Sequence, residues 1–255
     1  MIVRERPNDF VMIEQDNHAQ ASGDMMIQWK NDLFPGLHWR PSVEHAIRQH
    51  DVGWKSFDQQ PFWNDQKQAP YTFIDFPPIP KTILYKQGID EVERDDTYAA
   101  ILCSEHYKGF MEQEQGEAAR EFVQQEEQRQ QRLMTMLKDW NSTWFHNHYA
   151  FLQLADSLSL YACLNEPGVS KEQEHPFFKD GIPLSAKLDG ISHSKIKAHW
   201  LDQQTVALEP FPFHQPVDIA LPQKIVSKKD IDAKGLIKSY ENTPFHNIHL
   251  RLTAQ

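Results

Sequence analysis

The segment over residues 142–164 constrains the fold most, because it places a carboxylate in the middle of an apolar helical face. At helical spacing, one face of this segment carries Phe145, Tyr149, Leu152, Asp156, Ser159, Leu160 and Cys163. A buried carboxylate is costly unless it is paired with a charge or binds a metal. The sequence therefore predicts a helical core in which other elements supply a partner for Asp156.

Three further predicted helices direct a polar side chain towards an apolar face in the same way. Each of these side chains falls three, four or seven residues from apolar neighbours, so it lies on the stripe that faces the core. The inward groups are His18 in the helix predicted over 16–30, His50 with the adjacent Asp51 at the end of the helix predicted over 42–51, and His106 in the helix predicted over 96–107.

These inward groups together predict a metal site. Imidazole and carboxylate suit a divalent ion, and helical bundles hold metals on side chains that project into the core. The candidate ions are Mn, Fe, Zn, Mg and Ni, and the predicted ligands are His18, His50, Asp51, His106 and Asp156. For any one of these residues, a structural role without a metal stays open as an alternative. A lone inward histidine is more often a satisfied core residue, and a buried aspartate can cap a helix or pair with an arginine.

The other ten histidines are interpreted as ordinary residues, since some of thirteen histidines fall on apolar stripes by chance. They are His38, His45, His146, His148, His175, His193, His199, His214, His246 and His249.

Composition excludes several classes of function. The chain has 255 residues, and 40% of them are hydrophobic, enough for a substantial core. Its formal net charge is −10 and its Lys and Arg residues are scattered, so we expect no nucleic-acid partner. No apolar run approaches the length that spans a membrane, and the first residues do not resemble a signal peptide. The two cysteines form no CxxC pair, so we expect a soluble cytoplasmic protein.

The pattern along the chain predicts a mainly α fold with a small β appendage. Residues 1–15 read as a hairpin around Pro7 and Asn8, and Asp16 and Ser42 are the predicted N-caps of the first two helices. Residues 56–81 are rich in proline and aromatics, which indicates a long ordered loop. Strand-like alternation begins after residue 182. We expect a helical body over 1–180 and a β-rich appendage over 181–255, packed as one unit, which the N-terminal hairpin could join.

The motifs resemble those of the HD-domain superfamily of metal-dependent phosphohydrolases. Its signature is a His, a His-Asp doublet and a distant Asp, which are matched here by "DNHAQASG", "RQHDVGW" and "LQLADSLSLYAC". Some members add histidines after the doublet, as in "CSEHYKGF", and many carry Gly-Lys where this chain has Gly53 and Trp54. The same stretches also resemble a family of bacterial proteins catalogued as a domain of unknown function.

The HD resemblance implies a helical, metal-dependent enzyme that hydrolyses a phosphoester. Nucleotides are among the substrates that the resemblance allows. In this hypothesis Asp51 bridges or orients the attacking water, and His106 is a further ligand or a general acid. The 56–81 loop would form a wall of the pocket. The predicted substrate-binding residues are Trp54, Lys55 and Lys86, and Trp63 and Tyr71 are further candidates for stacking. Two alternatives stay open: a diiron oxygenase on the same scaffold, and a non-catalytic metal-binding or interaction protein. The expected partner is a small-molecule substrate, and a homodimer is left open.

Overall fold

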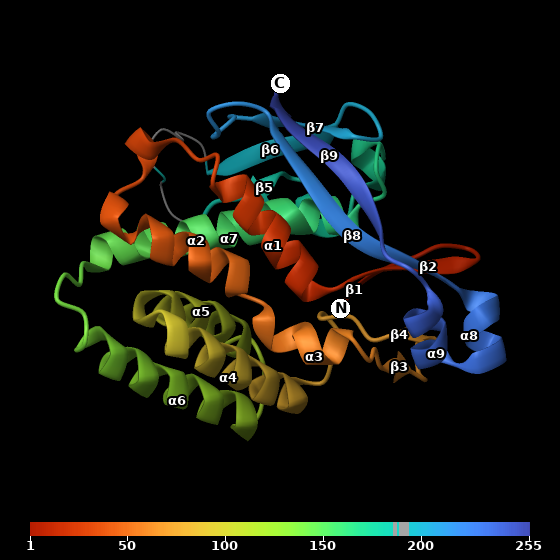
Figure 1. The fold of residues 1–255 in the computed structure, drawn as a ribbon, viewed down its shortest axis with the longest axis horizontal. Helices are drawn as coiled ribbons and strands as arrows, with labels where there is room; N and C mark the ends of the chain where they lie inside the picture. The colour runs from red at the N-terminus through yellow and green to blue at the C-terminus, as the bar shows by residue number, and fades with distance from the viewer. Residues whose placement is uncertain (186–187, 189–193) are drawn as a thin grey trace.

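The computed structural model describes residues 1–185, 188 and 194–255 (Figure 1). The N-terminal hairpin forms as its alternation predicts, with strands β1 (Ile2–Glu5) and β2 (Asp9–Ile13) paired antiparallel. Strand β2 also pairs antiparallel with β8 (Val217–Ser227), which lies more than two hundred residues further along the chain. The hairpin therefore joins the C-terminal strands in one sheet.

That sheet has seven strands within the described residues, in the order β1-β2-β8-β9-β7-β6-β5. The remaining strands are β5 (Ile182–Pro183), β6 (Lys195–Trp200), β7 (Thr205–Glu209) and β9 (His246–Ala254). Strands β7 and β9 pair in parallel, and every other neighbouring pair is antiparallel. The fold is thus α/β, which corrects the expectation of a mainly α chain with a small β appendage. Local alternation identifies single strands, whereas distant pairings such as β2 with β8 are not encoded locally.

The long helices are α1 (Gln15–Met26), α2 (Arg40–Gln49), α4 (Pro78–Asp95), α5 (Thr97–Met111), α6 (Glu117–Met134) and α7 (Ser142–Leu164). Helices α5 and α7 begin at capping side chains: Asp96 accepts from the Ala99 N–H, and Asn141 accepts from the Trp144 N–H. The predicted caps Asp16 and Ser42 lie inside their helices, because α1 and α2 begin one and two residues earlier.

Short elements connect these helices and strands. They are α3 (Lys55–Asp58), the hairpin of β3 (Trp63–Asn64) with β4 (Ala69–Pro70), α8 (Lys228–Lys234), α9 (Leu236–Asn242), and 3-10 turns at Asn31–Leu33, Leu37–Trp39, Val52–Trp54, Lys171–Gln173 and Pro176–Phe178. The predicted 56–81 loop therefore contains a small hairpin, and its last four residues are the first turn of α4.

Helix α1 is central to the packing, since it contacts α2, α7 and strand β8. Figure 1 shows α1 and α7 between the sheet and the group formed by α4, α5 and α6. Helix α5 in turn contacts α2, α4, α6 and α7. This arrangement directs one face each of α1, α2, α5 and α7 to a common point, where the candidate site lies. In the described part of the chain, no helix has both the length and the apolarity that a membrane span requires.

Candidate metal centre

The structure brings the five predicted ligands together inside the protein. His18 lies on α1, His50 directly follows α2, His106 lies on α5 and Asp156 lies on α7, and all of them are buried. Asp51 follows His50 and is also buried. Two groups of three have donor atoms close enough to share an ion: His18 with His50 and Asp51, and His50 with His106 and Asp156.

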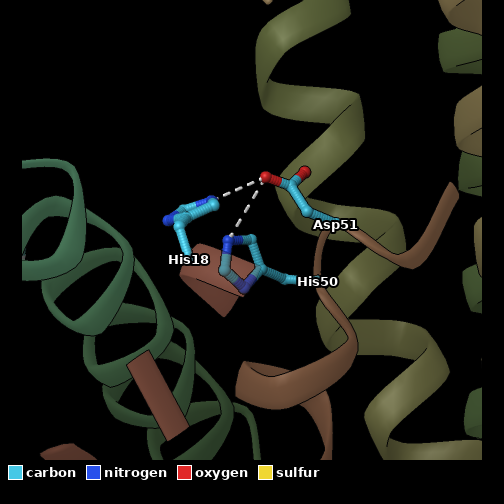
Figure 2. Close-up of side chains that lie close together, drawn as sticks. All are labelled: His18, His50 and Asp51. Carbon is cyan, nitrogen blue, oxygen red and sulfur yellow. Dashed lines mark hydrogen bonds and ion pairs between the residues drawn. The ribbon is translucent and has the colours of Figure 1, made fainter. Parts of the chain in front are cut away.

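The donor atoms converge on the Nε2 atom of His50. This atom lies 3.6 Å from Asp51 Oδ2 and 3.6 Å from Asp156 Oδ1. Figure 2 shows Asp51 facing both His18 and His50, and His18 Nε2 lies 2.8 Å from Asp51 Oδ2. His106 approaches from the far side, with its Nε2 atom 3.9 Å from Asp156 Oδ2.

These separations fit ligands of one ion better than a network of hydrogen bonds. Two ligands bound at about 2.1 Å from an ion lie about 3.0–3.4 Å apart for right-angled or tetrahedral geometry. The two His50 contacts, at 3.6 Å, are too long for hydrogen bonds and close to that range. His50 Nε2 is fully buried and has no hydrogen-bond partner. A buried nitrogen that has no hydrogen-bond partner and points between two carboxylates has the geometry expected of a metal ligand whose ion is absent.

The far side of each imidazole is held as ligating histidines usually are. His50 Nδ1 lies 2.7 Å from the Ile47 carbonyl oxygen, so this nitrogen carries a proton and Nε2 is the atom that can bind either a second proton or an ion. His18 Nδ1 lies 2.6 Å from Ser159 Oγ, whose hydroxyl donates to the Asp156 carbonyl at 2.9 Å. Ser159 Oγ therefore accepts from His18 Nδ1–H, which directs the His18 Nε2 lone pair at the centre.

The charges of the centre are strongly coupled. Burial alone would lower the pKa of His50, but the carboxylates of Asp51 and Asp156 outweigh it and raise the pKa to about 9. Burial would raise the pKa of Asp51, yet His50 and His18 lower it to about 2. The pKa of Asp156 is also lowered, against the effect of burial, by the same imidazoles. Both carboxylates are therefore ionised at neutral pH, and they attract a cation, either a proton on His50 or a metal.

The centre opens into a cavity of about 390 Å³, which gives it access to small molecules. Four of the five predicted ligands line this cavity, and His50 lies behind them. The lining residues are Gln15, His18, Asp51, Trp54, Phe73, Ile74, Lys81, Tyr85, His106, Phe110, Gln113, Glu114, Asp156, Leu160 and Phe177. The set combines a polar floor with aromatic and aliphatic walls, as small-molecule sites commonly do.

The predicted substrate-binding residues lie in different places. Trp54 lines the cavity, where it packs against Phe76 and Tyr85. Lys55 and Lys86 are outside its lining. Lys55 is half-exposed and pairs with Asp16 at 3.3 Å, and Lys86 is half-exposed and pairs with Asp90 at 3.6 Å. Among the further stacking candidates, Trp63 packs against Phe10 and Tyr71 against Phe76, and neither lines the cavity.

One histidine interpreted as ordinary is as deeply buried as the candidate ligands. The Tyr98 hydroxyl donates to His148 Nδ1 at 2.6 Å, and His148 Nε2–H donates to the Pro35 carbonyl at 2.8 Å. Both ring nitrogens of His148 thus have a hydrogen-bond partner, whereas Nε2 of His50 has none. His193 lies outside the described residues.

Several residues of the site were not predicted from the sequence. Gln15 donates to Asp51 Oδ2 at 3.0 Å, and Ser159 supports His18. Lys81 and Tyr85 enter the cavity from α4. Ser159 had a usable signal, because it shares the helical face of Asp156. Lys81 had no usable signal in the sequence, because its position depends on the path of residues 59–77.

Comparison with known proteins gives a family and no assigned activity. No match to the chain was found among curated proteins or among solved structures. No comparison links the chain to the HD-domain superfamily. The model of the family described as "Protein of unknown function (DUF3891)" matches residues 1–228, and the chain belongs to this family.

Proposed function

We propose that this protein is a metal-dependent hydrolase of phosphate esters, with the buried His/Asp centre as its active site. The observation that carries the proposal is the position of His50 Nε2. It is buried, has no hydrogen-bond partner and lies 3.6 Å from two carboxylates beside a cavity. His18, His50, Asp51, His106 and Asp156 would hold the ion. A divalent ion there would polarise a phosphoryl oxygen and lower the pKa of a water molecule.

Asp51 is the residue best placed to orient the attacking water. Its carboxylate lines the cavity, and its low pKa keeps it ionised at neutral pH. The Gln15 side-chain amide donates a hydrogen bond to its Oδ2 atom at 3.0 Å, and the same oxygen lies 2.8 Å from His18 Nε2. The carboxylate can therefore orient a water molecule by accepting a hydrogen bond from it, with little reorganisation.

His106 is better suited to the ligand role than to the role of general acid. Burial and the positive charge of His50 outweigh the attraction of Asp156 and lower the pKa of His106 to about 4. Its imidazole is consequently neutral at pH 7, which leaves a lone pair for an ion and no extra proton for a leaving group.

The relation to HD-domain enzymes is part of this proposal. Its support is that His18, the His50-Asp51 doublet and Asp156 come from three different helices and meet at one point. The residue after Gly53, where many HD-domain proteins have lysine, is the buried Trp54. Phosphate binding in this chain must therefore depend on a different residue.

A diiron oxygenase is less well supported than a hydrolase with one ion. Both candidate ligand groups contain His50, and both use its Nε2 atom. The Nδ1 atom is committed to the Ile47 carbonyl, so His50 cannot serve two ions. The two groups share this one atom, which favours one ion per chain.

Metal analysis and a substrate screen test the proposal together. Protein purified without chelator should retain one equivalent of a divalent metal, and added metal should raise its melting temperature. The metal-loaded protein should hydrolyse members of a panel of phosphomonoesters, phosphodiesters and nucleotides. Asp51→Asn and His50→Ala should abolish this hydrolysis, whereas His146→Ala, an exposed histidine on α7, should not.

Each reading has an outcome that rejects it. Absence of bound metal, with no thermal stabilisation by any ion of the panel, rejects the metal centre. Bound metal with no hydrolysis of any phosphoester rejects the hydrolase and leaves a non-catalytic metal-binding protein. Two iron equivalents with oxygen-dependent turnover would instead identify the oxygenase.

A further inference from the structure

Helix α4 presents two polar side chains to the cavity, one helical turn apart. Lys81 and Tyr85 are four residues apart, so they lie on the same face of the helix, and both line the cavity. The Lys81 side chain is 8% exposed and Tyr85 is 4% exposed, so both are largely buried beside the cavity.

Both groups are donors without an acceptor. In the part of the chain that the structure describes, neither Lys81 Nζ nor the Tyr85 hydroxyl makes a hydrogen bond to protein. Lys81 Nζ lies 3.7 Å from Glu114 Oε1, which is an ion pair at a distance too long for a hydrogen bond. Burial and the nearby carboxylates of Asp51 and Glu114 raise the pKa of Tyr85 well above its ordinary value, so its hydroxyl keeps its proton.

Donors that line a cavity and make no short hydrogen bond within the protein suit a ligand that supplies acceptor oxygens. A lysine ammonium offers three N–H donors, and a buried cation is costly when it is left without hydrogen bonds. Tyr85 lines the same cavity as Asp51 of the candidate metal centre and as Lys81 and Glu114, so one ligand in this cavity can contact all of them. A phosphoryl group attacked at the centre would therefore have its outer oxygens towards α4.

We propose that Lys81 and Tyr85 bind the phosphoryl oxygens of the substrate, and that this substrate is a small phosphate monoester with a flat or apolar organic group. This inference rests on the proposed hydrolase function and adds the residues and the substrate class. A monoester is favoured because a terminal phosphoryl group has free oxygens for both the ion and Lys81. A cavity of about 390 Å³ also suits a small molecule better than a polymer.

The organic group is inferred from the apolar residues of the cavity wall. Ile74, Phe110 and Phe177 line the cavity, yet they are 49%, 42% and 55% exposed. They come from the segment before α4, from α5 and from the turn Pro176–Phe178, so three separate parts of the chain bring apolar surface to one cavity. Exposed apolar side chains gathered at one pocket mark a place where an apolar group docks.

Glu114 would act as the counter-ion of Lys81 when the substrate is absent. It lies in the connection between α5 and α6 and is partly exposed, so its side chain can turn towards solvent. A phosphate dianion on Lys81 would have to displace this carboxylate or tolerate its repulsion. Removing the charge of Glu114 should therefore strengthen anion binding, which is the opposite of what a purely structural ion pair would do.

Calorimetric titration of the metal-loaded protein with inorganic phosphate tests these roles. Lys81→Met should weaken phosphate binding about tenfold or more, and Tyr85→Phe should weaken it several-fold, as expected for lost hydrogen bonds to a charged group. Glu114→Gln should strengthen binding. Lys86→Met is the matched control, since Lys86 lies on the same helix, outside the cavity and paired with Asp90, and it should bind phosphate as the wild type does.

The outcomes separate this inference from the proposed function. If the protein hydrolyses phosphoesters but Lys81→Met and Glu114→Gln bind phosphate as the wild type does, the Lys81 site is rejected and the hydrolase stands. If phosphate binding depends on Lys81 but no phosphoester is hydrolysed, the hydrolase is rejected and the anion site stands. If hydrolysis occurs, Lys81→Met should raise KM for p-nitrophenyl phosphate while metal content and melting temperature stay those of the wild type. Equal turnover of the diester bis-p-nitrophenyl phosphate would contradict the monoester class.

Discussion

The hydroxyl oxygen of Ser159 lies 2.6 Å from Nδ1 of His18 and fixes the orientation of that imidazole. Ser159→Ala should therefore weaken metal binding about 10- to 100-fold, the usual effect of losing a partner that orients a ligand. Competition with a metal-sensitive dye measures this affinity. Ser157→Ala, two residues away on another face of α7, is the control and should bind metal normally. Unchanged affinity of Ser159→Ala would mean that His18 is not a ligand.

The helical pattern of the sequence placed four of the five residues that meet at the centre, and Asp51 was included as the neighbour of His50. Periodicity fixes the direction of a side chain once the helix exists, and His18, His50, His106 and Asp156 all point inward as predicted. The prediction needed no knowledge of how the helices are joined.

The lysine of the cavity and the extent of the sheet were beyond the reach of such patterns. Helix α4 begins at Pro78, inside the segment predicted as a loop over 56–81, so Lys81 belongs to the helix and shares the face of Tyr85, whereas Lys86 lies outside the cavity. Its position depends on residues 59–77, whose path follows from tertiary contacts. Strand β2 pairs with β8, and β7 pairs in parallel with β9, and no local signal encodes either pairing.

Protons and metal should compete for His50. Its pKa of about 9 in the metal-free protein means that an ion must displace a proton at neutral pH. Metal affinity should therefore rise about tenfold per pH unit between pH 7 and pH 9, and about one proton should be released per ion. Calorimetry in buffers of different ionisation enthalpy counts these protons. His50→Gln should remove the pH dependence, and a wild-type affinity that does not change with pH would contradict the raised pKa.

The same shift predicts how the stability of the metal-free protein depends on pH. The pKa of His50 is raised from an ordinary value of 6.5, so its stabilising charge is fully present below that value and is lost as the pH rises through about 9. Between pH 7 and pH 9.5, the free energy of unfolding of the wild type should fall relative to that of His50→Gln. Urea denaturation in the presence of a chelator measures this difference. A parallel pH dependence of the two proteins would contradict the expectation.

His148 is a buried histidine with a structural role, in contrast to His50, because its two ring nitrogens form hydrogen bonds with Tyr98 and Pro35. His148→Phe should lower the free energy of unfolding by about 1–3 kcal/mol, since it leaves a buried hydroxyl and a carbonyl without partners. Metal content and metal affinity should stay at the wild-type level. Denaturation and metal titration of the same preparation check both statements, and loss of metal without loss of stability would place His148 in the centre.

Gly53 allows α4 to approach the turn that follows the His-Asp doublet. A Cβ atom at Gly53 would lie 2.3 Å from the Leu84 carbonyl oxygen, and one at Gly88 would lie 2.8 Å from the Gly53 nitrogen. Gly53→Ala must push α4 away, which should cost about 1–3 kcal/mol of stability, as overpacking commonly does. The shift should also withdraw Lys81 and Tyr85 from the cavity, so phosphate binding should weaken more than metal binding.

Gly109→Ala on α5 provides the comparison for Gly53→Ala. An added Cβ atom there meets only the Tyr149 hydroxyl, at 3.2 Å. Alanine is about 1 kcal/mol more favourable than glycine inside a helix, so this variant should be as stable as the wild type or more stable. Thermal denaturation compares the stability of the two variants, and phosphate titration compares their phosphate affinity. If Gly53→Ala matches Gly109→Ala in stability and in phosphate affinity, the close contact of α4 with the doublet does not hold the cavity in shape.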